Sequence, residues 1–157
     1  MKSRPSDCDK RPAVSRKKRA VRSNQLPAVY FAYGSNMNHD QMQVRCPTAK
    51  YLGPFYLQDW SLLIRYHATV IPDPGSRVAG ALWQVESSDV QALDRYEGVD
   101  YYYKRTVMRQ QGVDFFFYEM IDTGEGWPSH SYLRSIEQGY QHCGIPLAYF
   151  KPLLQGP

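Results

Sequence analysis

The stretch Val29 to Asn38 reads "VYFAYGSNMN", an apolar and aromatic run that ends abruptly at Gly34-Ser35-Asn36. Branched and aromatic residues are typical of a buried strand, so we expect a strand at 28–33. A plain turn would use the same small residues after it. Glycine, however, also lets backbone approach a ligand closely, and successive N–H groups after a strand form an anion-binding concavity. The stretch therefore indicates a strand followed by either a turn or a binding loop.

Further segments rich in branched and aromatic residues follow, separated by turn residues. A Pro/Gly turn at "IPDPGS" is expected to separate two of them, and Gln110-Gln111-Gly112 is expected to form a hairpin turn between two others. The remaining predicted strands are 60–71, 78–85, 103–109 and 113–121.

Two segments have helical signatures. In "SSDVQALDRYEG", Ser88 and Gln91 have capping-box spacing and Gly98 is a C-terminal stop. The second, "PSHSYLRSIEQGYQHCG", begins at Pro128-Ser129 and ends at Gly144. Many strands, few helices and no strand–helix alternation predict an α+β fold, a mostly antiparallel, barrel-like sheet with a few flanking helices.

The charge of this 157-residue chain is unevenly distributed, although its net value is only +4. Residues 1–23 hold nine Lys or Arg and two Asp, whereas the remainder holds ten Lys or Arg and thirteen Asp or Glu. The basic segment has few large apolar residues, so we predict a disordered tail at 1–26 and one folded domain at 27–157. We favour a solvated extension over a nucleic-acid arm, and expect no specific nucleic-acid binding.

Cysteine and histidine usage is unremarkable for a reducing compartment. The three Cys are odd in number and widely spaced, and the four His lack zinc-ligand spacing, so no metal site is predicted. No apolar run is long enough for a membrane span, and no apolar signal segment is evident near residue 1. We therefore expect a cytoplasmic protein with no membrane association; the sequence carries no signal of oligomeric state.

The first helix places a carboxylate on, or at the edge of, the face turned toward the core. Its apolar residues Val90 and Leu93 are three apart, and continuing the stripe leads to Tyr96 and Glu97. Burial and the C-terminal end of the helix dipole both raise the pKa of a carboxyl group. A carboxylate of that kind can take and return a proton near neutral pH. The competing interpretation is an edge carboxylate that pairs with one of three nearby cations, Arg95, Lys104 or Arg105.

Three phrases together carry a family resemblance: "FAYGSNM", "ALDRYEGVDYYYKR" and "PSHSYLRSIEQGYQHCGIPLAYFKPLL". They resemble the γ-glutamylcyclotransferase family, within the AIG2-like superfamily, and the resemblance covers residues 29–154. Met37 stands where some members have Leu. The Phe-Gly-Tyr-Gly-Ser-Leu version of the glutathione-specific branch is absent, since this chain has Asn36, so glutathione itself is not the expected substrate.

The resemblance implies a γ-glutamylcyclotransferase-like fold and an enzyme that needs no cofactor. Such enzymes cyclise a γ-glutamyl amide to 5-oxoproline and release the amine or amino acid. By the family's pattern Glu97 is the general acid and base. The substrate-binding residues carried over are Tyr33, Gly34, Ser35, Asn36, Tyr103 and Tyr132, with Tyr102 as the alternative to Tyr103.

Two other functions stay open at this point. One is a binding domain for a γ-glutamyl compound or another small metabolite that does no chemistry, since fold alone does not fix function. The other is a transferase or hydrolase acting on a different γ-glutamyl conjugate. In each case the expected partner is a small molecule.

Overall fold

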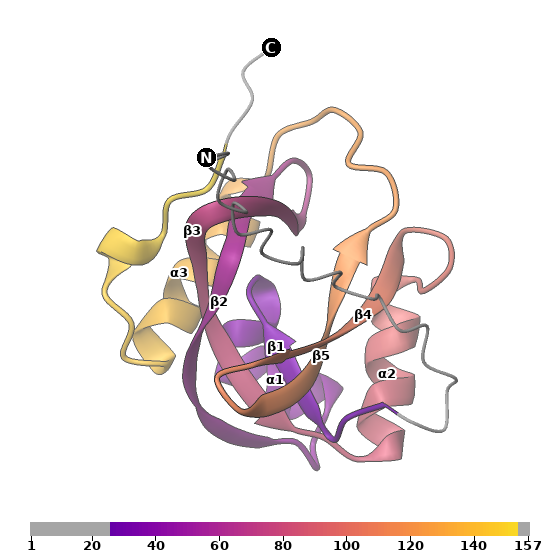
Figure 1. Ribbon diagram of the computed structural model, residues 1–157. Coiled ribbons are helices and arrows are strands. Elements are labelled where there is room, and N and C mark those ends of the chain that lie inside the picture. The colour runs from indigo at the N-terminus through magenta and orange to yellow at the C-terminus, as the bar shows by residue number, and fades with distance from the viewer. Residues whose placement is uncertain (1–25, 154–157) are drawn as a thin grey trace, which may run out of the picture.

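A computed structural model describes residues 26–153. The basic tail predicted at 1–26 lies outside this range except for Leu26. The described chain forms five strands, three α-helices and two short 3-10 helices (Figure 1). The strands are β1 (Val29–Ala32), β2 (Lys50–Ile64), β3 (Ala68–Gln84), β4 (Tyr103–Gln110) and β5 (Val113–Met120). The helices are η2 (Ser35–Met37), α1 (His39–Arg45), α2 (Ser87–Glu97), α3 (His130–His142) and η3 (Leu147–Tyr149).

The strands form one sheet in the order β2-β3-β1-β5-β4. The neighbours pair antiparallel except β1 and β5, which are parallel. The sheet curves so that its two edges meet at one end. There Gln58 of β2 and Gln110 of β4 exchange two hydrogen bonds of 2.9 Å, from Gln58 N–H to the Gln110 amide oxygen and from the Gln110 amide to the Gln58 carbonyl. The predicted α+β class with a mostly antiparallel sheet is confirmed.

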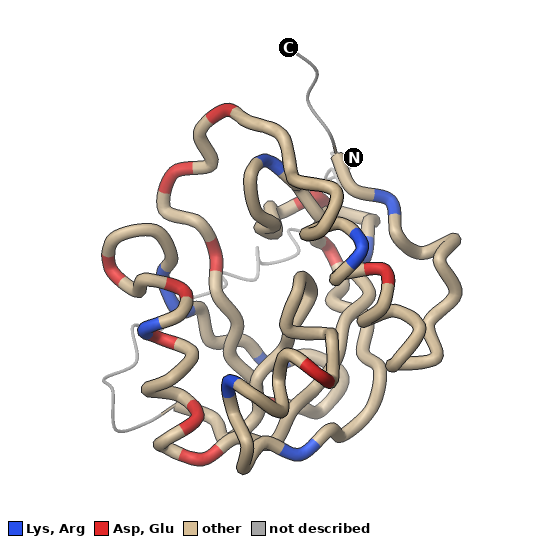
Figure 2. The backbone as a smooth tube through the Cα atoms, turned by 180° about the vertical axis from the view of Figure 1, so that it is seen from behind, with Lys and Arg blue, Asp and Glu red and all other residues tan. Residues whose placement is uncertain are grey.

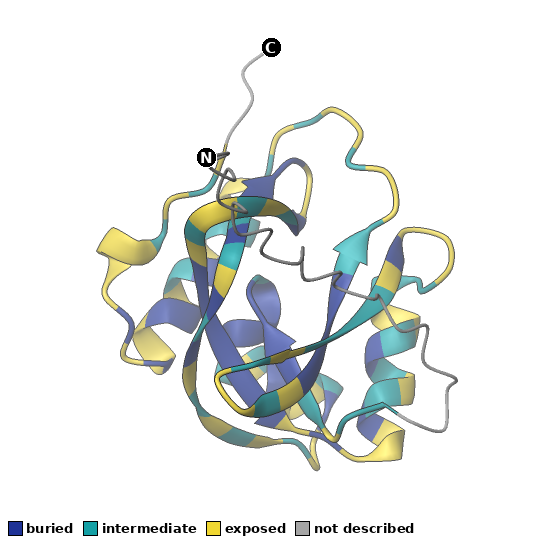
Figure 3. Cartoon of the chain, viewed as in Figure 1, coloured by how far each residue is buried: buried dark blue, intermediate teal, exposed yellow. Residues whose placement is uncertain are grey.

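Strand β1 lies at the centre of the sheet and of the core (Figure 3). Phe31 is fully buried, and its ring contacts the rings of Phe55, Phe115 and Phe117 at centroid distances of 5.8 to 6.5 Å. Tyr30, on the opposite side of the strand, stacks on Phe116 at 5.4 Å. A strand buried on both faces reads as a continuous apolar run, which explains "VYFA".

The predicted turn at "IPDPGS" between two strands was wrong. The chain reverses at residues 65–67, and the Pro-Gly segment lies within β3. It forms a bulge there, since Gln58 pairs with Arg77 but Trp60 pairs with Pro72. Polar side chains satisfy the bulged backbone: Gly75 N–H donates to Asp59 Oδ1 at 3.1 Å. These turn residues therefore form a bulge within one strand and do not reverse the chain, because β2 pairs with β3 both before and after them.

The start of α2 also differs from the prediction. The capping box consists of Glu86 and Asp89, not of Ser88 and Gln91. The Asp89 carboxylate accepts from Glu86 N–H at 2.9 Å and from Thr48 Oγ1 at 2.7 Å, which accounts for its burial. The predicted end is confirmed: Gly98 adopts φ 61°, a left-handed conformation that suits glycine and stops the helix directly after Glu97.

Helix α3 packs directly onto η2 at Gly139. A Cβ at this position would lie 2.6 Å from the Cβ of Met37 and 2.9 Å from its carbonyl carbon. Both distances are shorter than real Cβ contacts, so only glycine allows this approach. The helix begins at the residue after Ser129, whose side chain accepts the N–H of Tyr132 at 3.2 Å. Gly139 therefore sets the distance between α3 and the loop that follows β1.

Charged residues are dispersed over the described backbone, with basic and acidic positions interspersed (Figure 2). Some pair locally, as Arg109 does with Asp114 at 2.6 Å. Within residues 26–153 no helix has both the length and the apolar character needed to cross a membrane.

Candidate active site

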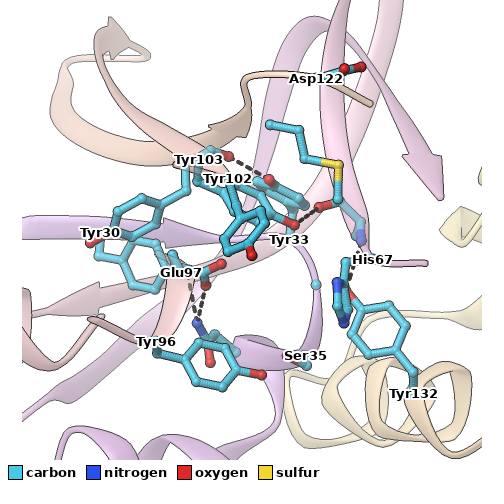
Figure 4. Close-up of a pocket in the computed structure, with 15 residues that line it drawn as sticks. Tyr30, Tyr33, Ser35, His67, Tyr96, Glu97, Tyr102, Tyr103, Asp122 and Tyr132 are labelled. Carbon is cyan, nitrogen blue, oxygen red and sulfur yellow. Dashed lines mark hydrogen bonds between the residues drawn. The ribbon is translucent and has the colours of Figure 1, made fainter. Parts of the chain in front are cut away.

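A cavity of about 400 Å³ opens where β1 ends, between the C-terminus of α2 and the N-terminus of α3 (Figure 4). It collects side chains from segments far apart in the sequence. All seven residues expected at the site line it: Tyr33, Gly34, Ser35, Asn36, Glu97, Tyr103 and Tyr132. Its other lining residues are Tyr30, His67, Ala68, Tyr96, Tyr102, Tyr118, Met120 and Asp122.

The loop after β1 is the 3-10 turn η2, which begins after Gly34. Met37 N–H donates to the Gly34 carbonyl at 3.1 Å, and Asn38 N–H donates to the Ser35 carbonyl at 3.0 Å. The N–H groups of Ser35 and Asn36 have no hydrogen-bond partner among residues 26–153, although both residues are buried. Free N–H groups at the start of a helical turn attract an anion. The segment is thus a turn whose free N–H groups suit an anion, and its role as a binding loop stays a prediction.

Glu97 is the last residue of α2, and its carboxylate faces the loop. Its Oε1 accepts a 3.1 Å hydrogen bond from the Asn36 side-chain amide. Burial raises the pKa of Glu97 to about 7, against opposing effects from Arg45 and from the Asn36 hydrogen bond. Two of the cations considered as alternative partners lie against other acids, Lys104 near Glu119 and Arg105 near Asp94. The described contacts of Glu97 therefore favour a proton-exchanging carboxylate over a salt-bridged one.

Two tyrosines form hydrogen bonds with the backbone of Ala68, the first residue of β3. The Tyr103 hydroxyl donates to the Ala68 carbonyl at 2.9 Å, whereas the Ala68 N–H donates to the Tyr132 oxygen at 2.8 Å. Tyr103 has therefore committed its proton and offers only lone pairs to the cavity. Tyr132 has accepted a bond, so its own proton remains available to a ligand. The ring of Tyr132 is further fixed by His67, at a centroid distance of 5.2 Å.

Tyr33 and Tyr30 also differ in whether the hydroxyl proton is used within the protein or is free. Tyr33 donates its hydroxyl proton to the Tyr118 carbonyl and so faces the cavity as an acceptor. Tyr30 accepts from the Asn36 amide at 3.1 Å and keeps its proton. Burial raises the pKa of these hydroxyls and of the Tyr103 and Tyr132 hydroxyls well above the ordinary value, so all four stay protonated. The donor and acceptor roles of these four hydroxyls are thus the same at every physiological pH.

Burial distinguishes Tyr102 from Tyr103, the two tyrosines of "YYYKR" considered for the site. Tyr103 is 7% exposed and hydrogen-bonded within the cavity wall, whereas Tyr102 is 72% exposed at the rim. Both line the cavity, but only Tyr103 is part of its polar interior. Assigning a substrate-binding role to Tyr103 stays a prediction.

Sequence reasoning missed Arg45, at the end of α1. Its guanidinium donates to the Asn36 side-chain oxygen and lies over the Tyr96 ring, 3.6 Å from the centroid. Nothing in the local pattern of the helix distinguishes Arg45 from a solvated basic residue, because its partners are brought to it by the fold. Tyr30 and Asp122 were missed for the same reason.

Comparison with known proteins identifies relatives along most of the chain. The family model described as gamma-glutamyl cyclotransferase, AIG2-like, matches residues 30–139. Gamma-glutamylcyclotransferase of Bos taurus is 32% identical over 143 residues, which cover 80% of this chain and 76% of the relative. The Homo sapiens protein of the same name is 30% identical, with the same coverage.

Solved structures agree with these relatives. A gamma-glutamyl cyclotransferase structure superimposes with a TM-score of 0.70 at 27% identity, covering 82% of this chain and 91% of that one. A human protein of similar fold gives a TM-score of 0.71 at 28% identity, with the same coverage.

Proposed function

The chain belongs to the AIG2-like gamma-glutamyl cyclotransferase family, and from that premise we propose that it cyclises a γ-glutamyl amide to 5-oxoproline and releases the amine. The observation that carries this proposal is the position of Glu97. A carboxylate whose pKa is about 7 faces a loop with free N–H groups across a cavity of molecular size. The reaction needs those two features side by side.

The fixed donors and acceptors suggest how the glutamyl group lies. Its α-carboxylate faces the N–H groups of Ser35 and Asn36, which favour an anion. Its α-ammonium lies against the lone pairs of Tyr33 and Tyr103 and beside Glu97. Its γ-carbonyl oxygen points to the free hydroxyl proton of Tyr132. Each substrate group then meets a protein group of complementary polarity.

The chemistry follows from this arrangement. Glu97 takes a proton from the α-ammonium, and the freed amine attacks the γ-carbonyl carbon, forming the ring carbon–nitrogen bond. Negative charge develops on the carbonyl oxygen, where the Tyr132 hydroxyl stabilises it. The tetrahedral intermediate then expels the original amide nitrogen, which receives the proton back from Glu97. The ring nitrogen, which still carries two hydrogens after the attack, loses one of them to the released amine or to solvent, so that the products are 5-oxoproline and the protonated amine. Because attack is intramolecular, holding the reactive conformer replaces a covalent nucleophile, and no cofactor enters the reaction.

The direct test is incubation of the protein with a panel of γ-glutamyl conjugates: dipeptides, γ-glutamylamines and glutathione. We expect 5-oxoproline to form in equal amount with the released amine, from a conjugate other than glutathione. Free glutamate in place of 5-oxoproline would indicate a hydrolase. Binding of the conjugates without any product would indicate a domain that only binds.

Gly34→Ala is expected to raise KM about tenfold while leaving Tm within about 2 °C of the parent. The φ of Gly34 is −118°, outside the left-handed region, and the new Cβ would meet Ala68 and Tyr132 at an ordinary 3.4 Å. The methyl group would, however, occupy the cavity wall where the substrate approaches the loop. Steady-state kinetics and thermal unfolding measure the two effects separately.

A suitable control is Gly112→Ala, in the β4–β5 hairpin turn. Gly112 has φ 78°, so alanine is strained there, but the site is remote from the cavity. This variant should lose stability and keep its KM. If Gly34→Ala instead behaved like Gly112→Ala, the glycine would serve the fold and not the ligand.

Tyr132→Phe is expected to lower kcat roughly tenfold, the value of one hydrogen bond made in the transition state. Tyr103→Phe should act mainly on KM, because Tyr103 offers the substrate an acceptor only. Each variant removes one of the bonds to Ala68, so the pair is matched for that loss. A kcat effect in Tyr103→Phe with none in Tyr132→Phe would contradict the assignment of the free proton.

A further inference from the structure

The Asn36 side chain is held at both ends inside the cavity wall. Its NH2 group donates to Glu97 Oε1 and to the Tyr30 hydroxyl, each at 3.1 Å. Its oxygen accepts from Nη1 of Arg45. Asn36 is 3% exposed, so water does not compete freely for these groups. Arginine has donors only, so its partner must be the amide oxygen, and the NH2 group is thereby directed to Glu97.

Arg45 is itself fixed by two elements. It is the last residue of α1, where a cation interacts favourably with the helix dipole. Its guanidinium stacks on Tyr96, the residue before Glu97 in α2, at 3.6 Å from the ring centroid. A planar guanidinium can stack and donate a hydrogen bond at the same time, which an ammonium cannot. Arg45 thus links α1 to α2 across the Asn36 amide.

We infer that Arg45 is a positioning residue, which fixes the Asn36 amide with its NH2 toward Glu97 and so holds that carboxylate ready as the base. A reversed amide would place its oxygen against the carboxylate, with two acceptors facing one another. The catalytic part of this inference rests on the function proposed above. The orientation of the amide does not depend on it.

The charges around Glu97 make the effect measurable. Five tyrosines face it from the core elements, and all stay neutral because burial raises the pKa of each: Tyr30, Tyr33, Tyr103, Tyr118 and Tyr132. His67 and Asp122 lie on the other side of the cavity (Figure 4). Among the described residues, Arg45 is the cation that lowers the pKa of Glu97, against burial, which raises it to about 7.

The experiment is a carbon-13 NMR titration of the Glu97 carboxyl group in the substrate-free protein. In Arg45→Met we expect the midpoint to rise by about one unit above the parent value. The midpoint of the acid limb in the pH profile of kcat/KM should move up by the same amount. As a result, kcat/KM at pH 6 should fall about tenfold. Arg45→Lys keeps the charge but cannot stack on Tyr96 and donate to Asn36 together, so its midpoint should lie between those of the parent and Arg45→Met. A midpoint equal to the parent's in Arg45→Lys would show that Arg45 acts through its charge alone and would contradict the positioning role. Arg95→Met, on the exposed face of α2, should leave it unchanged and serves as the charge-matched control.

A folded Arg45→Met protein with an unchanged Glu97 midpoint overturns the inference and leaves Arg45 a purely structural residue. If that variant does not fold, Arg45→Gln is titrated instead. Its Glu97 midpoint should also rise, and an unchanged midpoint would contradict the inference. Because the titration needs no substrate, it separates the two proposals. A shifted midpoint in a protein that forms no 5-oxoproline would refute the proposed reaction and keep the role of Arg45.

Discussion

Glu97→Gln is expected to lower turnover about 10²-fold or more, the usual effect of removing a general acid–base group. Glutamine keeps the size of the side chain, and its oxygen can still accept the Asn36 hydrogen bond, but it has no proton to exchange. Substrate affinity should change far less, because the proposed binding mode places the glutamyl group mainly on the loop after β1. Single-turnover kinetics and a binding titration give the two quantities. Glu125→Gln, an exposed carboxylate outside the cavity lining, is the matched control and should keep parent turnover.

The same variant should alter how stability depends on pH. Glu97 has its pKa raised from 4.5 to about 7, so the folded parent binds the proton more tightly than the unfolded chain does. The parent's free energy of unfolding should therefore fall as pH rises from about 4.5 to about 7. Glu97→Gln lacks this fall, and at pH 8 it should be the more stable protein, by at most about 3 kcal/mol. Denaturant unfolding at pH 5 and pH 8 tests the difference.

A Glu97→Gln protein that formed 5-oxoproline at close to the parent rate would end the mechanism proposed here. A Glu97→Gln protein less stable than the parent at pH 8 would also contradict the mechanism. It would indicate that the Glu97 carboxylate stabilises the fold through a salt bridge. In the parent, the acid limb of kcat/KM should have its midpoint near pH 7.

Gly139→Ala is the other variant for which we expect a large effect. Its free energy of unfolding should be lower than the parent's by about 2–3 kcal/mol. The new methyl group would collide with Met37, whose backbone belongs to η2, so the loop or the helix must move. A displacement of about 1 Å in a positioning element can reduce kcat/KM about 10²-fold. Urea unfolding and steady-state kinetics on the folded fraction measure both losses. Arg134→Ala, on the exposed face of the same helix, should show neither. A folded Gly139→Ala protein with parent kcat/KM would show that α3 does not position the loop.

The sequence predicted the elements with strong local signals. The buried run at β1, the hairpin at Gln110-Gln111-Gly112 and the stop at Gly98 are all present, since each depends on a few adjacent residues. Helical periodicity placed Glu97 on the core-facing side of α2 or at its edge, and left the choice between them open. The catalytic and binding roles of the cavity residues came from the family resemblance, and stay predictions.

Long-range pairing is what the sequence did not reveal. Pro72 to Ser76 has the composition of a reversing turn, yet the register of β2 against β3 makes it a bulge. The parallel pairing of β1 with β5 has no local signature either. Arg45 and Tyr30 were missed because their roles depend on partners brought together only by the fold. In each case tertiary contacts outweighed local preference.

The two ends of the cavity are built from different kinds of structure. The end that the proposed function assigns to the glutamyl group lies on the central strand and on helix termini. The other end is bordered by the turn at 65–67 and by the segment between β5 and α3, which contains Asp122. Connecting segments accept substitution and changes of length more readily than the elements they join. If the proposed function holds, the choice of leaving amine can therefore diverge during evolution, or be redesigned, by altering these two segments while Glu97 and the loop after β1 stay unchanged.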